Sequence, residues 1–445
     1  MMTPEQAREL ARLAVSMTDS DQAEALVAAE KSALTRFANN RINQNVAEEN
    51  ALVSIRAVVG KRVGVASTNR LDDASLRATA QAAVRAARIA PEDSAFPGLP
   101  APEPVREAHR GVQATRDFDA AARAEAVGGI VAQSSSRGLT AAGKVRSAEQ
   151  VIAVANSLGV DVGQSITGAQ ATVLSMGAET GSGWASFLDA DVRNLAPEAL
   201  GSQAADLAQR SANPVALDPG EYTVVLAPEA VADIMDFLAY VGFSAKAVDE
   251  GRSFMSGHLE EGLMSEHVSI FDDALSDHAM GLTFDYEGQP KRTVPLIEYG
   301  VAIKPVTDSY WAAKTGWNNT GHALPAPNPY GPMPLNMEMW PGEASIDELI
   351  GGVKRGVYVT RFHYVNVEDP ISVLLTGMTR DGTFMIEDGR LTSPLKNLRF
   401  TQSAVDALYW CEGATRERRF VGTEEGACFV PGLLIAKFNF TGQTS

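Results

Sequence analysis

From residue 357 the chain reads Val357-Tyr358-Val359-Thr360-Arg361-Phe362-His363-Tyr364, in which β-branched or aromatic residues alternate with polar ones. This alternation is typical of a β-strand with one buried face. Two Asp-Gly pairs follow, at Asp381-Gly382 and Asp388-Gly389, and each separates two strand-like segments. Because Asp-Gly between such segments is a strong hairpin signal, the C-terminal part of the chain is predicted to be a large antiparallel β-sheet with a barrel-like core.

The N-terminal part mixes strand-like and helix-like segments. Residues 51–58, for example, alternate in the way a half-buried strand does. A turn-rich segment at residues 213–220 separates this mixture from the strand-like residues 222–226. We therefore predict an α+β fold, with an N-terminal α/β lobe of antiparallel strands and helices at residues 1–214 and a mainly β C-terminal lobe at residues 215–445.

The composition is that of an ordinary globular protein. Of the 445 residues, 45% are hydrophobic and 21% are charged. The 38 Lys and Arg residues face 55 Asp and Glu residues, and the formal net charge of -17 disfavours nucleic acid and anionic membranes as partners. Two cysteines, Cys411 and Cys428, are too few for a disulfide framework. With no basic region followed by an apolar run at the start, a cytoplasmic location is expected.

Several C-terminal motifs occur in the order in which one protein family has them. They are Phe284-Asp285-Tyr286-Glu287-Gly288, Thr320-Gly321-His322-Ala323-Leu324, Thr360-Arg361-Phe362-His363-Tyr364, Thr376-Gly377-Met378-Thr379-Arg380-Asp381-Gly382-Thr383-Phe384 and Pro394-Leu395-Lys396-Asn397-Leu398-Arg399-Phe400-Thr401. On these motifs the chain resembles the TldD/PmbA family, also described as peptidase U62 or modulator of DNA gyrase. The N-terminal lobe matches that family only in its α/β texture.

The chain departs from this family at the metal site. The zinc peptidases of the family carry a His-Glu-x-x-x-His helix after a Val-Val-Leu strand, and a cysteine nearer the C-terminus supplies a further ligand. Here Val224-Val225-Leu226 precedes residues 228–241, which contain no histidine. Because imidazole nitrogens must reach the zinc at about 2.0–2.1 Å, Phe or Val cannot replace them, and no metal site is predicted in this chain. Glu229 is interpreted as a helix-dipole carboxylate, and Cys428, near the position of the cysteine ligand, as a buried thiol.

This departure makes the chain similar to the metal-free PmbA or TldE branch of the family. The resemblance implies a subunit that forms a heterodimer with a zinc-bearing TldD-like partner and helps to enclose a cleft in which unfolded peptides are hydrolysed. The chain is then a component of a metallopeptidase and is not catalytic alone. The name modulator of DNA gyrase reflects a substrate peptide and implies no DNA contact.

The sequence offers few other groups for chemistry. His258, His267 and His278 share an acidic stretch, but gaps of nine and eleven residues do not place them on one helical face, so they are interpreted as surface histidines. Neither a Gly-x-Ser-x-Gly elbow nor a phosphate-binding loop occurs. The candidates for catalysis are His322, His363 and Cys428, and those for substrate binding are Thr320, His322, Arg361, His363 and Arg380.

Two local patterns suggest these candidates. Residues 318–322 form a turn-like loop of the kind that can line a cleft. Arg361 and His363 are two apart on one strand, so their side chains are expected on one face, with Tyr358, Phe362 and Tyr364 on the other.

Two alternatives to the subunit hypothesis stay open. The chain is either a stand-alone, zinc-independent hydrolase of an amide or peptide conjugate that uses these candidates, or a non-catalytic peptide-binding homodimer.

Overall fold

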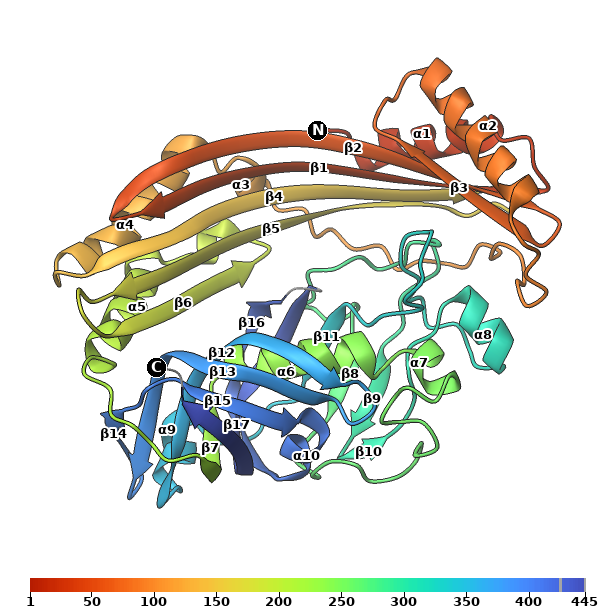
Figure 1. Cartoon of the computed structure of the whole chain (residues 1–445). Coiled ribbons are helices and arrows are strands. Elements are labelled where there is room, and N and C mark those ends of the chain that lie inside the picture. Colours follow the sequence, from red (N-terminus) through yellow and green to blue (C-terminus); the bar gives the residue numbers. More distant parts are fainter. Residues whose placement is uncertain (424–425, 444–445) are drawn as a thin grey trace.

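The computed structural model describes residues 1–423 and 426–443. Two β-sheets form its framework, and the first arches over the lobe that contains the second (Figure 1). Helices and strands are both abundant, and the predicted α+β class is confirmed. Among the helices of the described residues, none combines the length and the apolarity needed to cross a bilayer.

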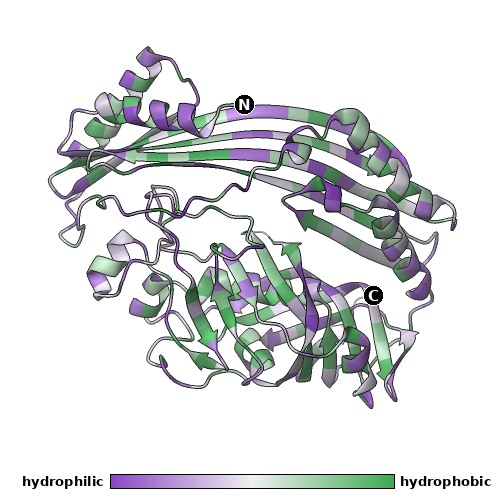
Figure 2. Cartoon of the chain, turned by 180° about the vertical axis from the view of Figure 1, so that it is seen from behind, coloured by the Kyte–Doolittle hydropathy of each residue, from purple (hydrophilic) through white to green (hydrophobic). Residues whose placement is uncertain are grey.

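The first sheet consists of six antiparallel strands in the order β3-β2-β1-β4-β5-β6. The strands are β1 (Gln22–Ala38), β2 (Arg41–Val59), β3 (Arg62–Thr68), β4 (Thr140–Asn156), β5 (Asp161–Met176) and β6 (Ser182–Asp189). Several of them are unusually long, since strands commonly have about 5 to 6 residues. Figure 2 shows hydrophilic and hydrophobic residues alternating along them, as expected where the two faces have different surroundings.

One face of this sheet is covered by helices. Helices α1 (Pro4–Ser16) and α2 (Asp73–Ile89) pack at one end against odd-numbered residues such as Val27 and Ile55, and α4 (Ala120–Ser135) and α5 (Pro197–Arg210) cover the other end. The short α3 (Gln113–Arg116) lies against β4 and β5, and a 3-10 turn, η1 (Val192–Asn194), lies beside α3. Many of the buried residues under α1 and α2 are alanines, which let the helices approach the strands closely.

The opposite face of the first sheet turns toward the C-terminal lobe. Its even-numbered residues Leu26, Ile152 and Val154 pack on Leu282 and Phe284 of that lobe. Arg56 on β2 also crosses the boundary, because its guanidinium donates a hydrogen bond to Glu287 of that lobe. The lobes thus share a hydrophobic contact at one end, while further along they separate to leave pockets lined by both lobes. We retain residue 215 as the proposed boundary between them.

The core of the C-terminal lobe is a closed ring of strands. In order around the ring they are β7 (Gly220–Leu226), β12 (Arg355–Asp369), β13 (Leu374–Glu387), β15 (Leu398–Ser403) and β17 (Ala427–Gln443), and β17 pairs again with β7. This closure is the barrel-like core that the sequence predicted. The sheet is mixed, because β7 is parallel to β12 and β11 is parallel to β17.

The remaining elements extend or cover this ring. Strands β11 (Asn336–Met339), β8 (Ile270–Asp272), β9 (Val294–Glu298) and β10 (Val301–Ala302) continue the sheet from β17, β14 (Arg390–Pro394) pairs with β13, and β16 (Cys411–Gly422) pairs with β17. The helices are α6 (Pro228–Val241), α7 (Ala245–Asp249), α8 (Ser309–Thr315), α9 (Ile346–Gly351) and α10 (Ala404–Tyr409). The largest hydrophobic core lies in this lobe and includes the apolar stripe of α6.

The two Asp-Gly pairs behave differently. Asp388-Gly389 forms the turn between β13 and β14, as predicted. Asp381-Gly382 does not form a hairpin, and that prediction is wrong: both residues have positive φ inside the continuous strand β13. The Asp381 carboxylate accepts hydrogen bonds from Arg361 on β12 and from Ser182 on β6, so contacts from outside the segment hold it in a bulge.

Candidate functional site

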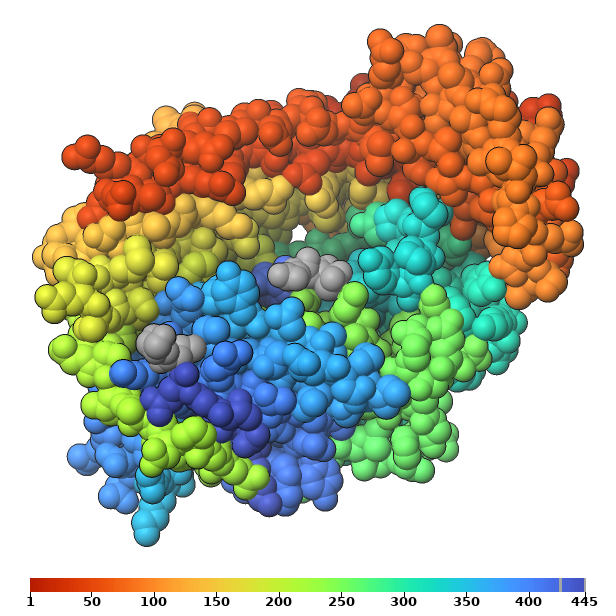
Figure 3. Space-filling view, viewed as in Figure 1, coloured from red at the N-terminus to blue at the C-terminus, as the bar shows by residue number. Residues whose placement is uncertain are grey.

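The surface between the two lobes is hollowed, as the space-filling view shows between the N-terminal sheet and the C-terminal lobe (Figure 3). Two pockets lie in this interlobe cleft, and residues of both lobes line each of them. We name them the central pocket, which includes Leu188 and Phe429, and the lateral pocket, which includes Trp184 and Arg361. The site is built by the packing of distant segments.

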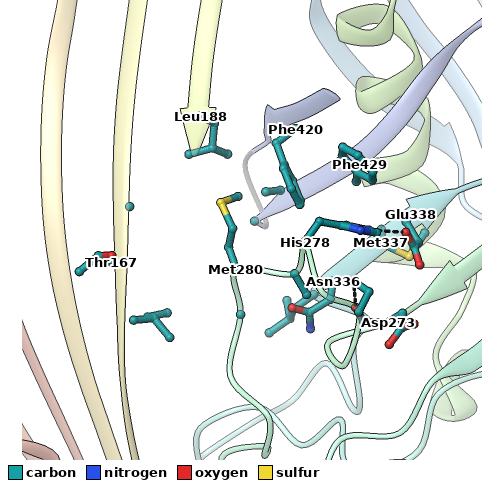
Figure 4. Close-up of a pocket in the computed structure, with 18 of the residues that line it drawn as sticks. Thr167, Leu188, Asp273, His278, Met280, Asn336, Met337, Glu338, Phe420 and Phe429 are labelled. Atoms are coloured by element: carbon teal, nitrogen blue, oxygen red, sulfur yellow. Dashed lines mark hydrogen bonds and ion pairs between the residues drawn. The ribbon is translucent and has the colours of Figure 1, made fainter. Parts of the chain in front are cut away.

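The central pocket has a volume of about 330 Å³ and an aromatic wall. Phe420 and Phe429 are directly paired on β16 and β17, with ring centroids 4.6 Å apart. His278 lies 4.4 Å from the ring of Phe429, and its Nε2 is 2.8 Å from Glu338 Oε2 (Figure 4). Arg418 Nη1 donates to the same carboxylate oxygen at 3.1 Å. His278, interpreted from the sequence as a surface residue, is therefore part of a charged cluster in the cleft.

The lateral pocket, of about 310 Å³, joins the start of α6 to β6. Arg361 places its guanidinium 4.4 Å from the ring centroid of Trp184 and 2.7 Å from Asp381. Glu229, in the first turn of α6, accepts a hydrogen bond from Arg419 at 2.5 Å. Position and pairing together stabilise the Glu229 carboxylate, since an acidic group at a helix N-terminus is favoured by the helix dipole.

Beneath the cleft, α6 places two carboxylates near Cys428. Pro228 at the helix start and the stripe of Val231, Ile234 and Leu238 fix how α6 packs on the barrel. Burial raises the pKa of Asp233 to about 7, even though Arg361 and the backbone N–H of Phe362 favour its charged form. Burial also raises the pKa of the Cys428 thiol, and the nearby carboxylates of α6 add to the effect. The thiol is therefore held in its neutral form.

Thr320 and His322 belong to a buried network. His322 is 0% exposed, its Nε2 lies 2.9 Å from Asp272 Oδ1, and its Nδ1 lies 2.9 Å from Thr320 Oγ1. Burial alone would raise the pKa of Asp272, but the contact with His322, the nearby Lys291 and the Asn336 N–H lower it to about 2. The loop of Thr320 and His322 was expected to line a cleft, and this expectation is not met, because His322 has no surface to offer a ligand.

His363 and Arg380 lie toward the surface of β12 and β13. Burial and the neighbouring arginines lower the pKa of His363, whose ring centroid lies 4.3 Å from that of Tyr364 at an interplanar angle of 50°. Simple alternation predicted that Tyr364 shares the face of Phe362. That prediction is wrong, because Tyr364 has φ 51° and is 73% exposed, whereas Phe362 is buried. Register shifts just before Arg361 and after His363 interrupt the alternation. Arg380 lies 4.0 Å from Asp381 and so adjoins the Arg361 cluster.

Comparison with known protein families decides where this architecture belongs. The model of the PmbA/TldA metallopeptidase C-terminal domain matches residues 219–442, which is half of the chain. The chain belongs to the PmbA/TldA metallopeptidase family. Domain 1 of the family matches residues 23–87, and its central domain matches residues 103–212. The resemblance seen in the C-terminal motifs is thereby confirmed for the N-terminal lobe as well.

Individual relatives agree with this family. A metalloprotease of Methanothermobacter thermautotrophicus is 26% identical over 226 residues, 50% of this chain and 49% of the relative. A zinc metalloprotease TldD homolog of Saccharolobus solfataricus is 26% identical over 238 residues, 49% of each chain. The chain thus spans about half the length of the curated relatives it matches.

Solved structures share the whole fold. The crystal structure of TldE from Thermococcus kodakarensis has a TM-score of 0.89 at 20% identity and covers 98% of this chain and 99% of its own. A protein described as a modulator of DNA gyrase, from Thermotoga maritima, has a TM-score of 0.85 at 20% identity, with 94% and 96% covered. At this level of identity these matches establish the fold alone.

The zinc that the PmbA/TldA metallopeptidase family implies does not fit the residues present here. Zinc in proteins is held by thiolate, imidazole and carboxylate ligands in a tetrahedral arrangement. Helix α6 offers Asp233 and Asp236 and no imidazole, and the Cys428 thiol is neutral. Within residues 1–423 and 426–443 no group of three or more His, Cys, Asp or Glu side chains is placed to hold a metal ion. We therefore derive no reaction step through a metal bound to this chain.

Asp233 should make stability depend on pH. Its folded pKa of about 7 lies above the ordinary value of 3.8, so the folded state binds the proton more tightly and the free energy of unfolding falls as pH rises between these values. Asn still accepts from Phe362 N–H but carries no charge. We expect Asp233→Asn to raise the free energy of unfolding by about 1 to 2 kcal/mol at about pH 8.5 and by much less at about pH 5. Urea unfolding at both pH values checks this, and an equal effect at both would contradict it.

Proposed function

We propose that this chain is a metal-free, TldE-like subunit of a two-chain metallopeptidase that degrades or processes unfolded peptides, with zinc held by a TldD-like partner. The observation that carries the proposal is the content of α6 beside Cys428: two carboxylates and a neutral thiol stand where the family's zinc peptidases have imidazoles and a thiolate. A family member that lacks zinc ligands needs a second chain to hold the catalytic metal. Its interlobe cleft supplies the place where a peptide lies.

A free sheet edge gives a physical route to the partner. Gly60 and Lys61 form a two-residue turn, so Val59 and Arg62 beside it are a hydrogen-bonded pair. The backbone N–H and C=O groups of the odd-numbered residues of β2 therefore point toward β3, and those of the even-numbered residues point toward β1. The register of β2 on β1 is unbroken from Val58 back to Gln44, so odd-numbered residues 45–51 direct their N–H and C=O groups away from β1. In the described part of the chain β3 reaches only to Val53, and these groups have no strand beside them. A homologous partner with the same edge would continue the sheet across the interface.

The proposal includes the cell compartment and excluded partners. Both cysteines are free and buried, which suits a reducing cytoplasm. The net charge of -17 supports peptides and a protein subunit as partners, in preference to nucleic acid or an anionic membrane.

The test is an activity assay with separate and mixed subunits. The purified chain is expected to cleave no unfolded peptide by itself, and a TldD-like subunit from the same genome is expected to cleave at least about tenfold faster when the chain is added. Ala47→Pro removes an outward N–H of β2 and should abolish this gain, whereas the control Ala47→Ser keeps the N–H and should retain it.

The other readings give different results in the same assay. Peptidase activity of the chain alone after metal removal would favour a stand-alone hydrolase. A stable homodimer by native mass spectrometry, with no effect on a TldD-like subunit, would favour a non-catalytic peptide-binding protein.

A further inference from the structure

We propose that the central pocket binds one large apolar side chain, aromatic or Leu or Met, of an extended peptide lying in the interlobe cleft. The inference rests on the proposed function, because a peptide must enter the cleft before one of its residues can be selected. It adds a specificity that the proposed function does not contain.

The size and lining of the pocket suit a single side chain. Ile166 and Leu188 line it from β5 and β6, and Met280, Phe420 and Phe429 line it from the C-terminal lobe (Figure 4). A volume of about 330 Å³ is near the lower end of the range of roughly 300 to 1,000 Å³ found for small-ligand sites. The flexible thioether of Met280 can adapt to side chains of different shape.

The aromatic wall is already ordered before a ligand arrives. Phe429 contacts Phe420 with an interplanar angle of 31°, His278 lies on it, and the Arg418 guanidinium is 4.3 Å from its ring centroid. Because these neighbours fix the ring, little side-chain freedom is lost when an apolar group packs against it.

The charged groups of the pocket already have contacts within the chain, and Arg146 of the lining is ion-paired with Glu30. Glu338 is bound by both His278 and Arg418, so its carboxylate is neutralised within the chain. The Asp273 carboxylate accepts hydrogen bonds from Leu275 N–H and from the Thr293 hydroxyl. An entering charged side chain would lose its hydration and would have to compete with these existing contacts, which disfavours charged residues. The pocket therefore selects by apolar burial.

Gly168 on β5 keeps the pocket open. A Cβ at this position would meet no heavy atom within 4 Å, although the residue lines the pocket. A larger side chain there would project into the space that the peptide residue is to occupy. Gly442 near the end of β17 also has open space around a Cβ and lies outside the pocket lining, which makes it a matched control.

The experiment measures binding of a fluorescent ten-residue peptide of Gly, Ser and Asn with one central residue varied among Phe, Ala, Lys and Asp. On the full chain, Phe is expected to bind about ten- to a hundredfold more tightly than Ala, from the burial of one aromatic side chain. Gly168→Val should lower the affinity for the Phe peptide to that for the Ala peptide. Gly442→Val should leave the preference for Phe unchanged. Leu188→Asp, which alters the neighbouring strand β6 of the same wall, should weaken Phe binding as well.

Several outcomes overturn the inference. Equal affinity for Phe and Ala, tighter binding of Lys or Asp, undetectable binding of every peptide, or a Phe preference that survives Gly168→Val would each do so. Loss of the preference in the presence of partner-dependent peptidase activity would contradict the pocket assignment alone. A preference kept by a chain that does not stimulate a TldD-like subunit would contradict the proposed function alone.

Discussion

Replacing His322 with leucine is expected to lower the free energy of unfolding by about 3 to 5 kcal/mol. The side chain is 0% exposed and its Nε2 holds Asp272, whose carboxylate also has no exposed surface. Leucine fills similar space but leaves that carboxylate without its main partner. Removal of one member of a buried pair has this large cost because water cannot replace the lost partner, and here only the nearby Lys291 and the Asn336 N–H remain to compensate the charge. Urea unfolding at about pH 7.5 measures it.

His258 provides the matched control. Its Nδ1 lies 2.8 Å from Glu261, the same kind of pair, but both side chains are more than half exposed. Since exposed pairs contribute roughly 0 to 1 kcal/mol, His258→Leu should change the free energy of unfolding very little. Equal effects of the two substitutions would show that burial of the His322–Asp272 pair does not have the energetic role assigned to it.

Replacing Arg56 with leucine should also destabilise the protein by about 3 to 5 kcal/mol near pH 8. Arg56 on β2 donates to Glu24 at 2.7 Å and to Glu287 of the C-terminal lobe at 3.0 Å, and both carboxylates are nearly buried. Without the guanidinium, two carboxylates stay close together at the lobe boundary. The variant should therefore loosen the contact between the lobes as well as the fold.

The pH dependence of this effect follows from Glu24. Burial already raises its pKa to about 7, although Arg56 favours the charged form, and removal of Arg56 raises it further. As the carboxyl is protonated in acid, Arg56→Leu should cost less near pH 5 than near pH 8. Arg62→Leu is the control, since Arg62 is exposed and its ion pair with Glu92 is long, at 4.0 Å. A similar cost for both arginines, or a cost of Arg56→Leu independent of pH, would contradict the role given to the buried cluster.

Local patterns predicted much of the fold. Alternation identified β12, the Asp388-Gly389 turn identified the hairpin of β13 and β14, and Pro228 marked the start of α6. Each of these signals lies within a few residues of the element it specifies, so no knowledge of the tertiary structure is needed. The series of C-terminal motifs, which occur in the order found in the family, then predicted a family membership that three domain matches confirm.

What failed depended on contacts between distant segments. The bulge at Asp381 exists because Ser182, nearly two hundred residues earlier, bonds its carboxylate. His278 joins Glu338, sixty residues away, and Arg418, so its spacing to other histidines carried no information about its role. The cleft itself is a product of lobe packing. Short-range periodicity contains no signal for such sites.

The metal content of the untagged chain, purified by itself, tests the central claim most directly. Zinc would be measured by mass spectrometry after dialysis against zinc at low concentration and then against metal-free buffer, with a TldD-like subunit treated in parallel. With α6 bearing Asp233 and Asp236 beside the neutral Cys428 thiol, we expect the TldD-like subunit to retain zinc and this chain to retain far less than one equivalent. One tightly held zinc ion per molecule of this chain would contradict the account.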